Sequence, residues 1–173
     1  MTRLIESVVS ALATTPPRWA ALAGIEPDLL ARRPAPGEWS AIECLGHVVD
    51  TEAAVFLARV LAVREGRDFA AFDPDAEGAP VARSLGALAA DFATLRAASL
   101  EVLATLTDAD LDRTARHAEL GHVTLRELLN EWAAHDTMHL VQAERALMQA
   151  FIPGSGPWRP YFADHDVEAT GAA

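Results

Sequence analysis

The chain has 173 residues, with 25 acidic and 14 basic side chains and a formal net charge of −11. This length predicts a single domain with a substantial core, while one cysteine cannot form an internal disulfide. The acidic balance argues against nucleic-acid and anionic-membrane partners, and the absence of lysine from the sequence excludes Schiff-base chemistry by that residue. Glu6 interrupts the N-terminal apolar stretch, and no apolar run is long enough to span a membrane, so we expect a cytoplasmic location.

The first half of the chain predicts two long helices. The first spans residues 2–14, and the prolines at 16–17 are expected to interrupt it before a second, short segment. The second begins at Ser40, whose spacing from Glu43 is that of a capping box, and continues to about Arg64. This second helix is apolar on two sides, so we expect one side to face the core and the other a pocket or a second subunit.

The second half of the chain predicts two more long helices. The third spans residues 83–106, where apolar residues recur at helical spacing. The fourth begins at Thr124, which opens another capping box, and ends near Ala150. Short extra helical turns are expected in the connections, at residues 28–31 and 107–110.

Four long amphipathic helices predict an all-α fold, a four-helix bundle. We place a single domain at residues 1–165 and a disordered tail at residues 166–173. The connection at residues 113–123 is expected to be irregular or briefly extended, and residues 73–80 to form a loop. The aromatic residues at 158–162 can pack back onto the body of the bundle.

Three of the six histidines fall on inward-facing helical positions. His135 and His139 are four residues apart, which puts both imidazoles on one face of the fourth helix. This spacing suits two ligands of one metal ion, although hydrogen-bonded core histidines share it. His47 lies on the second helix among small and polar residues that leave space around it. If the two helices face each other, three imidazoles converge, and three protein ligands with open positions are typical of a catalytic metal site.

Two segments of the sequence resemble signatures of the DinB/YfiT-like superfamily. Residues 38–47 (EWSAIECLGH) are similar to its second-helix signature, and residues 135–142 (HDTMHLVQ) to its fourth-helix signature. Residues 121–129 and 156–158 resemble the segments around them. The resemblance covers nearly the whole chain and implies an up-down-down-up bundle that holds one divalent metal ion through three histidines and often forms homodimers. By position, those histidines are His47, His135 and His139.

The same resemblance implies a metal-dependent enzyme that acts on a small molecule. Relatives include metal-dependent hydrolases and S-transferases that use a low-molecular-weight thiol, and the residues of this chain do not choose between the two. The sequence does not distinguish Zn, Ni, Fe or Mn as the divalent ion. The alternative is a non-catalytic dimeric bundle that binds a metal or another ligand.

Several polar residues near these histidines are candidates for supporting roles. Glu131, four residues before His135, is either a general base or an exposed helix charge. Asp50 and Glu43 either orient ligand histidines by accepting their second N–H group or are ordinary charges of a helix surface. Gln142, three residues after His139, is a candidate to bond either a ligand or a histidine.

The other histidines, the cysteine and two tryptophans are expected to have structural roles. We interpret the histidines as solvent-facing or bonded to backbone, the cysteine as packing, and the tryptophans as packing anchors. These residues are His117, His122, His165, Cys44, Trp39 and Trp132. A transferase for an anionic thiol would also need an arginine near the mouth of its pocket. The arginines available for this are Arg59, Arg83, Arg96 and Arg145.

Overall fold

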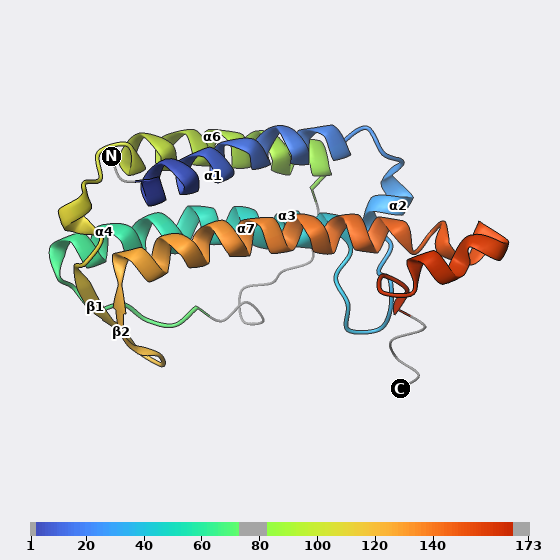
Figure 1. The fold of residues 1–173 in the computed structure, drawn as a ribbon. Helices are drawn as coiled ribbons and strands as arrows, with labels where there is room; N and C mark the ends of the chain where they lie inside the picture. Colours follow the sequence, from blue (N-terminus) through green and yellow to red (C-terminus); the bar gives the residue numbers. More distant parts are fainter. Residues whose placement is uncertain (1–2, 73–82, 168–173) are drawn as a thin grey trace.

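The computed structural model describes residues 3–72 and 83–167, and it contains the four predicted long helices (Figure 1). The predicted loop at residues 73–80 lies outside the described residues. The long helices are α1 (Arg3–Leu22), α3 (Ala41–Thr51) continued through the π-helical turn η1 (Glu52–Phe56) into α4 (Leu57–Glu65), α6 (Leu85–Leu103) and α7 (Leu125–Met148). The short elements are α2 (Pro27–Ala31), η2 (Asp108–Asp110), β1 (Thr114–His117), β2 (Gly121–Thr124) and η3 (Ile152–Phe162).

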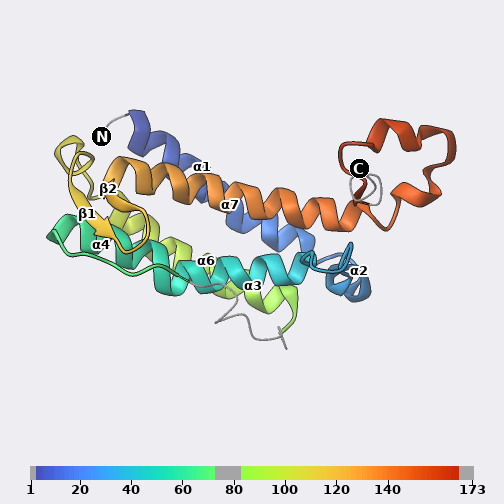
Figure 2. The same cartoon turned by 90° about the horizontal axis from the view of Figure 1, so that it is seen from below.

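The helices form a bundle in which neighbours are not consecutive in the sequence. α1 and α7 run in one direction, while α3–α4 and α6 run in the other (Figures 1 and 2). Each of α1 and α3 packs against both α6 and α7. This is the up-down-down-up bundle that the sequence predicts, and it places α3 beside α7 along their length. Within the described ranges, no helix combines the length and apolar character needed to cross a membrane.

Both predicted capping boxes are present and fix where the two site helices begin. The Glu43 carboxylate accepts from the Ser40 backbone N–H at 2.9 Å, and Ser40 Oγ accepts from the Glu43 backbone N–H. Thr124 caps α7 in the same way, with its backbone N–H 2.7 Å from a Glu127 carboxylate oxygen. Each box satisfies N–H groups that a helix start otherwise leaves without partners.

The prediction that α1 ends before its prolines is wrong, because the helix continues through Pro16 and Pro17 to Leu22. Proline has no N–H group to donate, so Pro16 leaves the carbonyl of Leu12 without its helical partner. Two side chains supply donors in its place, since Arg96 Nη1 lies 2.9 Å and the Thr15 hydroxyl 3.0 Å from that oxygen. Side chains of α6 and of α1 itself therefore compensate for the hydrogen bond that the proline removes.

The connection between α6 and α7 contains a short antiparallel hairpin, in agreement with the expected brief extension. β1 pairs with β2 from Thr114 opposite Thr124 to His117 opposite Gly121. The chain after α4 adds to this hairpin, because the Phe69 backbone N–H donates to the Arg116 carbonyl at 3.1 Å. The hairpin and this segment lie together at one end of the bundle (Figure 1).

The C-terminal segment differs from the prediction in two respects, the packing of its aromatic residues and the start of its tail. Trp158 and Tyr161 do not pack back on the bundle, and their exposed fractions are 64% and 82%. The reason is that η3 extends past the end of α7 and does not fold along the helices (Figure 1). Asp166 and Val167, placed in the predicted tail, are held by Arg159 and Gln149 respectively. The rest of that tail, residues 168–173, lies outside the described residues.

A buried layer of charge separates two apolar clusters along the bundle. Arg96 of α6 is 1% exposed and pairs with Glu52 at 2.8 Å and with Asp136 at 2.9 Å. The hydroxyl of Thr15 and the indole N–H of Trp132 bond to the same carboxylates, on Asp136 and Glu52 respectively. All four helices contribute a residue, so these hydrogen bonds fix the helices relative to one another. We call Glu52, Arg96 and Asp136 the buried triad.

Candidate metal centre

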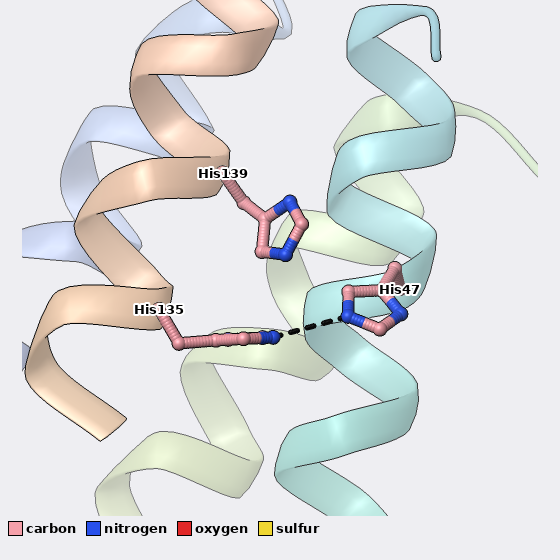
Figure 3. A group of neighbouring side chains, drawn as sticks. All are labelled: His47, His135 and His139. Carbon is pink, nitrogen blue, oxygen red and sulfur yellow. Dashed lines mark hydrogen bonds between the residues drawn. The ribbon is translucent and has the colours of Figure 1, made fainter. Parts of the chain in front are cut away.

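Three histidines converge between α3 and α7. His47 extends from α3 toward His135 and His139 on α7 (Figure 3). Nε2 of His47 lies 3.1 Å from Nε2 of His135, and one ring nitrogen from each histidine lies within 4.8 Å of the others. Metal–nitrogen bonds of about 2.0–2.1 Å hold tetrahedral ligands about 3.4 Å apart, so the set fits one divalent ion after small side-chain adjustments. It is the one group of potential ligands found in the part of the chain that the structure describes.

The surroundings keep these imidazoles neutral, which is the form that binds a metal ion. Desolvation lowers the pKa of His47 to about 4 and that of His135 to about 3, and repulsion between the rings adds to both effects. Desolvation also lowers the pKa of His139, against the opposing effect of its hydrogen bond to Gln142. At neutral pH all three rings therefore present free electron pairs without first losing a proton.

Gln142 orients His139 as the sequence predicts. Gln142 Oε1 lies 2.9 Å from His139 Nδ1. An amide oxygen only accepts, so Nδ1 carries the proton and Nε2 keeps its lone pair for a ligand. No such partner is found for His135, whose Nδ1 is buried and without a hydrogen bond among the described residues.

Aromatic rings pack around the imidazoles. Trp39 stacks on His139 with centroids 5.7 Å apart and lies 5.0 Å from the ring of His47. Phe56 meets His135 edge to face at 5.0 Å. Trp39 is therefore part of the site and not only a packing anchor, whereas Trp132 is fully buried and stacks on Phe56 in the core.

The three carboxylates predicted to lie near the histidines have different surroundings in the structure. The carboxylate of Glu43 serves the Ser40 capping box and an ion pair with Arg33, so it does not orient a histidine. Asp50 is exposed. Glu131 is exposed over much of its surface, yet its carboxylate borders a small cavity in which desolvation raises its pKa against the pull of Arg59.

Cys44 is a packing residue, as predicted. Its side chain is fully buried in the apolar cluster, where desolvation raises the pKa of the thiol to about 12. A thiol with that pKa stays protonated at neutral pH. Such a group is neither a nucleophile nor an available metal ligand.

The buried triad lies next to the histidines and has no counterpart in the sequence-based site. Asp136 directly follows His135 and precedes His139 by three residues, and Glu52 follows the helical turn that carries His47. Arg96 is consequently unavailable to bind a thiol, which removes it from the four arginines considered for the pocket mouth. Arg83 is also committed elsewhere, in an exposed pair with Asp91.

Two open cavities lie along the site helices, and of these two the larger has one of the three histidines in its wall. The larger, about 510 Å³, is lined by His139, Trp39, Gln142 and Arg145, and it opens beside the α7 side of the cluster. The smaller, about 260 Å³, runs over Ala54 and Ala58 of the second predicted helix. The second apolar side of that helix thus faces a pocket, one of the two alternatives drawn from the sequence.

The three remaining histidines lie away from the cluster. His122 and His165 are exposed. His117 is bonded to backbone, as predicted, but it is buried, with 7% of its surface exposed. Its ring lies beside Arg59 of α4, and no pattern in the sequence indicates this contact.

The fold and the cluster together define a four-helix bundle with a three-histidine centre, and the comparisons agree. A model of the DinB superfamily matches residues 11–143, so the chain belongs to that superfamily. Among solved structures, YfiT from Bacillus subtilis is similar over 87% of this chain and 89% of its own, with 17% identity and a TM-score of 0.75. YfiT is described as a probable metal-dependent hydrolase with an unusual four-helix bundle topology. No curated protein matches the chain.

Proposed function

We propose that this protein is a metal-dependent hydrolase of a small molecule and binds one divalent ion through His47, His135 and His139. The observation that carries the proposal is the convergence of three neutral imidazoles, with ring nitrogens within 4.8 Å, beside an open cavity. Three ligands leave coordination positions for water and substrate, whereas structural zinc sites are usually closed by four. The description of YfiT as a probable metal-dependent hydrolase supports the same reaction class.

The residues of the chain would have distinct tasks in this reaction. A divalent ion, when bound, would supply the Lewis acidity that activates a nucleophile and polarises the substrate. Gln142 would hold His139 in the tautomer that binds the ion. Trp39 would cover one side of the centre and limit access of water. Glu131 is the carboxylate that we propose as proton acceptor, one helical turn before His135.

A thiol S-transferase is the second candidate, and the position of Arg145 favours it. Arg145 lines the larger cavity together with His139, where its guanidinium can meet an anionic group of a low-molecular-weight thiol. Assays of thiol consumption with a panel of electrophiles, run beside assays with activated esters and amides, distinguish the two reactions. A metal-loaded protein inactive in both assays would favour the non-catalytic binding bundle. The homodimer and the cytoplasmic location remain predictions.

Metal content tests the three-histidine site directly. Protein purified without a histidine tag is expected to carry close to one divalent ion per chain, and His47→Ala to carry less than a tenth of that, because two imidazoles bind far more weakly than three. The measurement is plasma mass spectrometry of the dialysed proteins. His122→Ala is the matched control, since that ring is exposed and distant from the cluster, and it should retain its metal. Equal substoichiometric metal in all three proteins would refute the site.

The role of Gln142 gives a second, finer prediction. Gln142→Leu removes the acceptor for His139 Nδ1–H and should weaken metal binding by about 10–100-fold. Gln142→Glu keeps an acceptor oxygen and should retain the affinity. Competition with a chromophoric chelator measures both. A loss in Gln142→Glu as large as that in Gln142→Leu would mean that the residue acts through packing alone.

A further inference from the structure

A second group of polar side chains lies under the hairpin, separate from the three histidines. Arg59 of α4 and His117 of β1 border a cavity of about 180 Å³ between the hairpin, α4 and α7. Arg59 Nη2 donates to the Ala70 carbonyl at 3.2 Å and lies 3.5 Å from His117 Nε2, and the guanidinium stacks over Phe69 with 5.3 Å to the ring centroid. Phe69 in turn meets His117 edge to face at 5.5 Å. These contacts hold both polar groups at the cavity wall.

The hydrogen bonds of His117 determine which of its nitrogens carries the proton. Nδ1 accepts from the backbone N–H groups of Glu119 and Leu120, at 3.1 and 3.2 Å. Since a nitrogen that accepts cannot carry a proton, the proton of the ring is on Nε2. Nε2–H then faces an N–H of Arg59, and two donors cannot satisfy each other. Only 7% of the surface of His117 is exposed. Its Nε2–H group therefore requires an acceptor inside the cavity.

Neither carboxylate that lines the cavity is bonded to the Nε2–H group of His117, so a ligand would supply the acceptor. The Glu127 carboxylate is engaged in the capping box of Thr124. Glu131 is close enough to influence Arg59 electrostatically but forms no ion pair with it among the described residues. The remaining wall is apolar and includes Leu128 and Val123. An apolar pocket with two convergent donors, one of them charged, is complementary to an oxyanion on a short hydrocarbon chain.

This cavity shares two wall residues, Arg59 and Phe69, with the 260 Å³ cavity over Ala54 and Ala58. The second cavity is also lined by Phe72, whose ring lies 6.1 Å from that of His47. Arg59 also contributes to lowering the pKa of His135, which places its charge near the cluster. A ligand anchored at Arg59 therefore lies near the three histidines.

We propose that Arg59 and His117 form an oxyanion-binding subsite, and that the substrate is a small molecule bearing a carboxylate. The proposal deepens the proposed function and rests on it for the reaction that the substrate undergoes. The subsite itself depends only on residues outside the three-histidine cluster. It explains how an acidic protein can take an anionic substrate, because one half-buried guanidinium and one N–H donor supply the local complement.

Butyrate and its neutral isostere butyramide are the probes for this subsite. We expect butyrate to bind the protein, both zinc-loaded and after chelation, and to shift the ring resonances of His117 in nitrogen-15 spectra. Arg59→Met should weaken butyrate binding about 10–100-fold, the range for loss of a hydrogen bond to a charged group, and leave butyramide unaffected. Arg59→Lys keeps the charge and should fall between the two. Arg18→Met, at an exposed arginine of α1, is the matched control.

Three results would overturn the subsite. The first is a His117 ring protonated on Nδ1 in the same spectra, because the two donors would then not exist. The second is equal affinity for butyrate and butyramide. The third is butyrate binding that appears only in Glu131→Gln, which would show that Glu131 already occupies the donors. Loss of metal in the content measurement bears on the proposed function alone, since butyrate is also tested without metal.

Discussion

Replacing Arg96 with methionine is expected to lower the free energy of unfolding by about 3–5 kcal/mol. The guanidinium is 1% exposed and holds two carboxylates, those of Glu52 and Asp136, that are equally buried. Methionine fills a similar volume but leaves both carboxylates without a counter-charge where water cannot reach them. It also removes one of the two side-chain donors to the Leu12 carbonyl, which Pro16 leaves without its helical partner. Each of these losses acts in the same direction.

Urea denaturation measures this loss of stability, and two further variants serve as comparisons. Arg83→Met removes the exposed pair with Asp91 and should change stability by less than about 1 kcal/mol. Arg96→Met combined with Glu52→Leu and Asp136→Leu replaces the whole buried triad by apolar residues, and it should recover most of the loss. A loss below about 1 kcal/mol in Arg96→Met alone would mean that water reaches the triad.

The three residues of the buried triad occupy positions at which helical periodicity predicts a core side chain. Arg96 follows Phe92 by four residues on the apolar face of α6, and Asp136 follows Trp132 by four on that of α7. Glu52 likewise precedes buried Phe56 by four. Three charged residues of opposite sign, each on a core face, indicate an internal ion-pair network. The sequence therefore places all three charges on core faces, although it does not determine that they pair with one another.

Other features depend on contacts that no local pattern encodes. The four helices, both capping boxes and the convergence of His47 with His135 and His139 follow from spacing, capping chemistry and the family signatures. The passage of α1 through Pro16 is accompanied by a donor to the Leu12 carbonyl from α6, 84 residues later in the chain. The contact of Arg59 with His117 depends on how the hairpin folds under α4. Periodicity places residues on faces, but it does not determine which distant groups meet there.

Metal-free protein is expected to lose stability as the pH falls from about 6.5 to about 4, and the loss begins at a higher pH than the titration of ordinary carboxylates. Folding lowers the pKa of His47 to about 4 and that of His135 to about 3, from an ordinary value of 6.5. Below pH 6.5 the unfolded chain therefore binds protons that the folded chain does not, which favours unfolding. The loss of stability begins near pH 6.5 and stops growing once the pH is below the folded-state values.

The expected loss is about 2 kcal/mol from each of these two histidines, after allowing for screening by solvent at partly exposed rings. Urea midpoints of chelated protein at pH 7.0, 6.0, 5.0 and 4.5 measure it. His135→Gln should flatten the dependence by about half, because one of the two titrating rings is gone, whereas His122→Gln should leave it intact because that ring is exposed. A midpoint that is constant between pH 7.0 and 4.5 would show that protons reach the cluster freely. In that case the neutral imidazoles on which metal binding depends would need another explanation than desolvation.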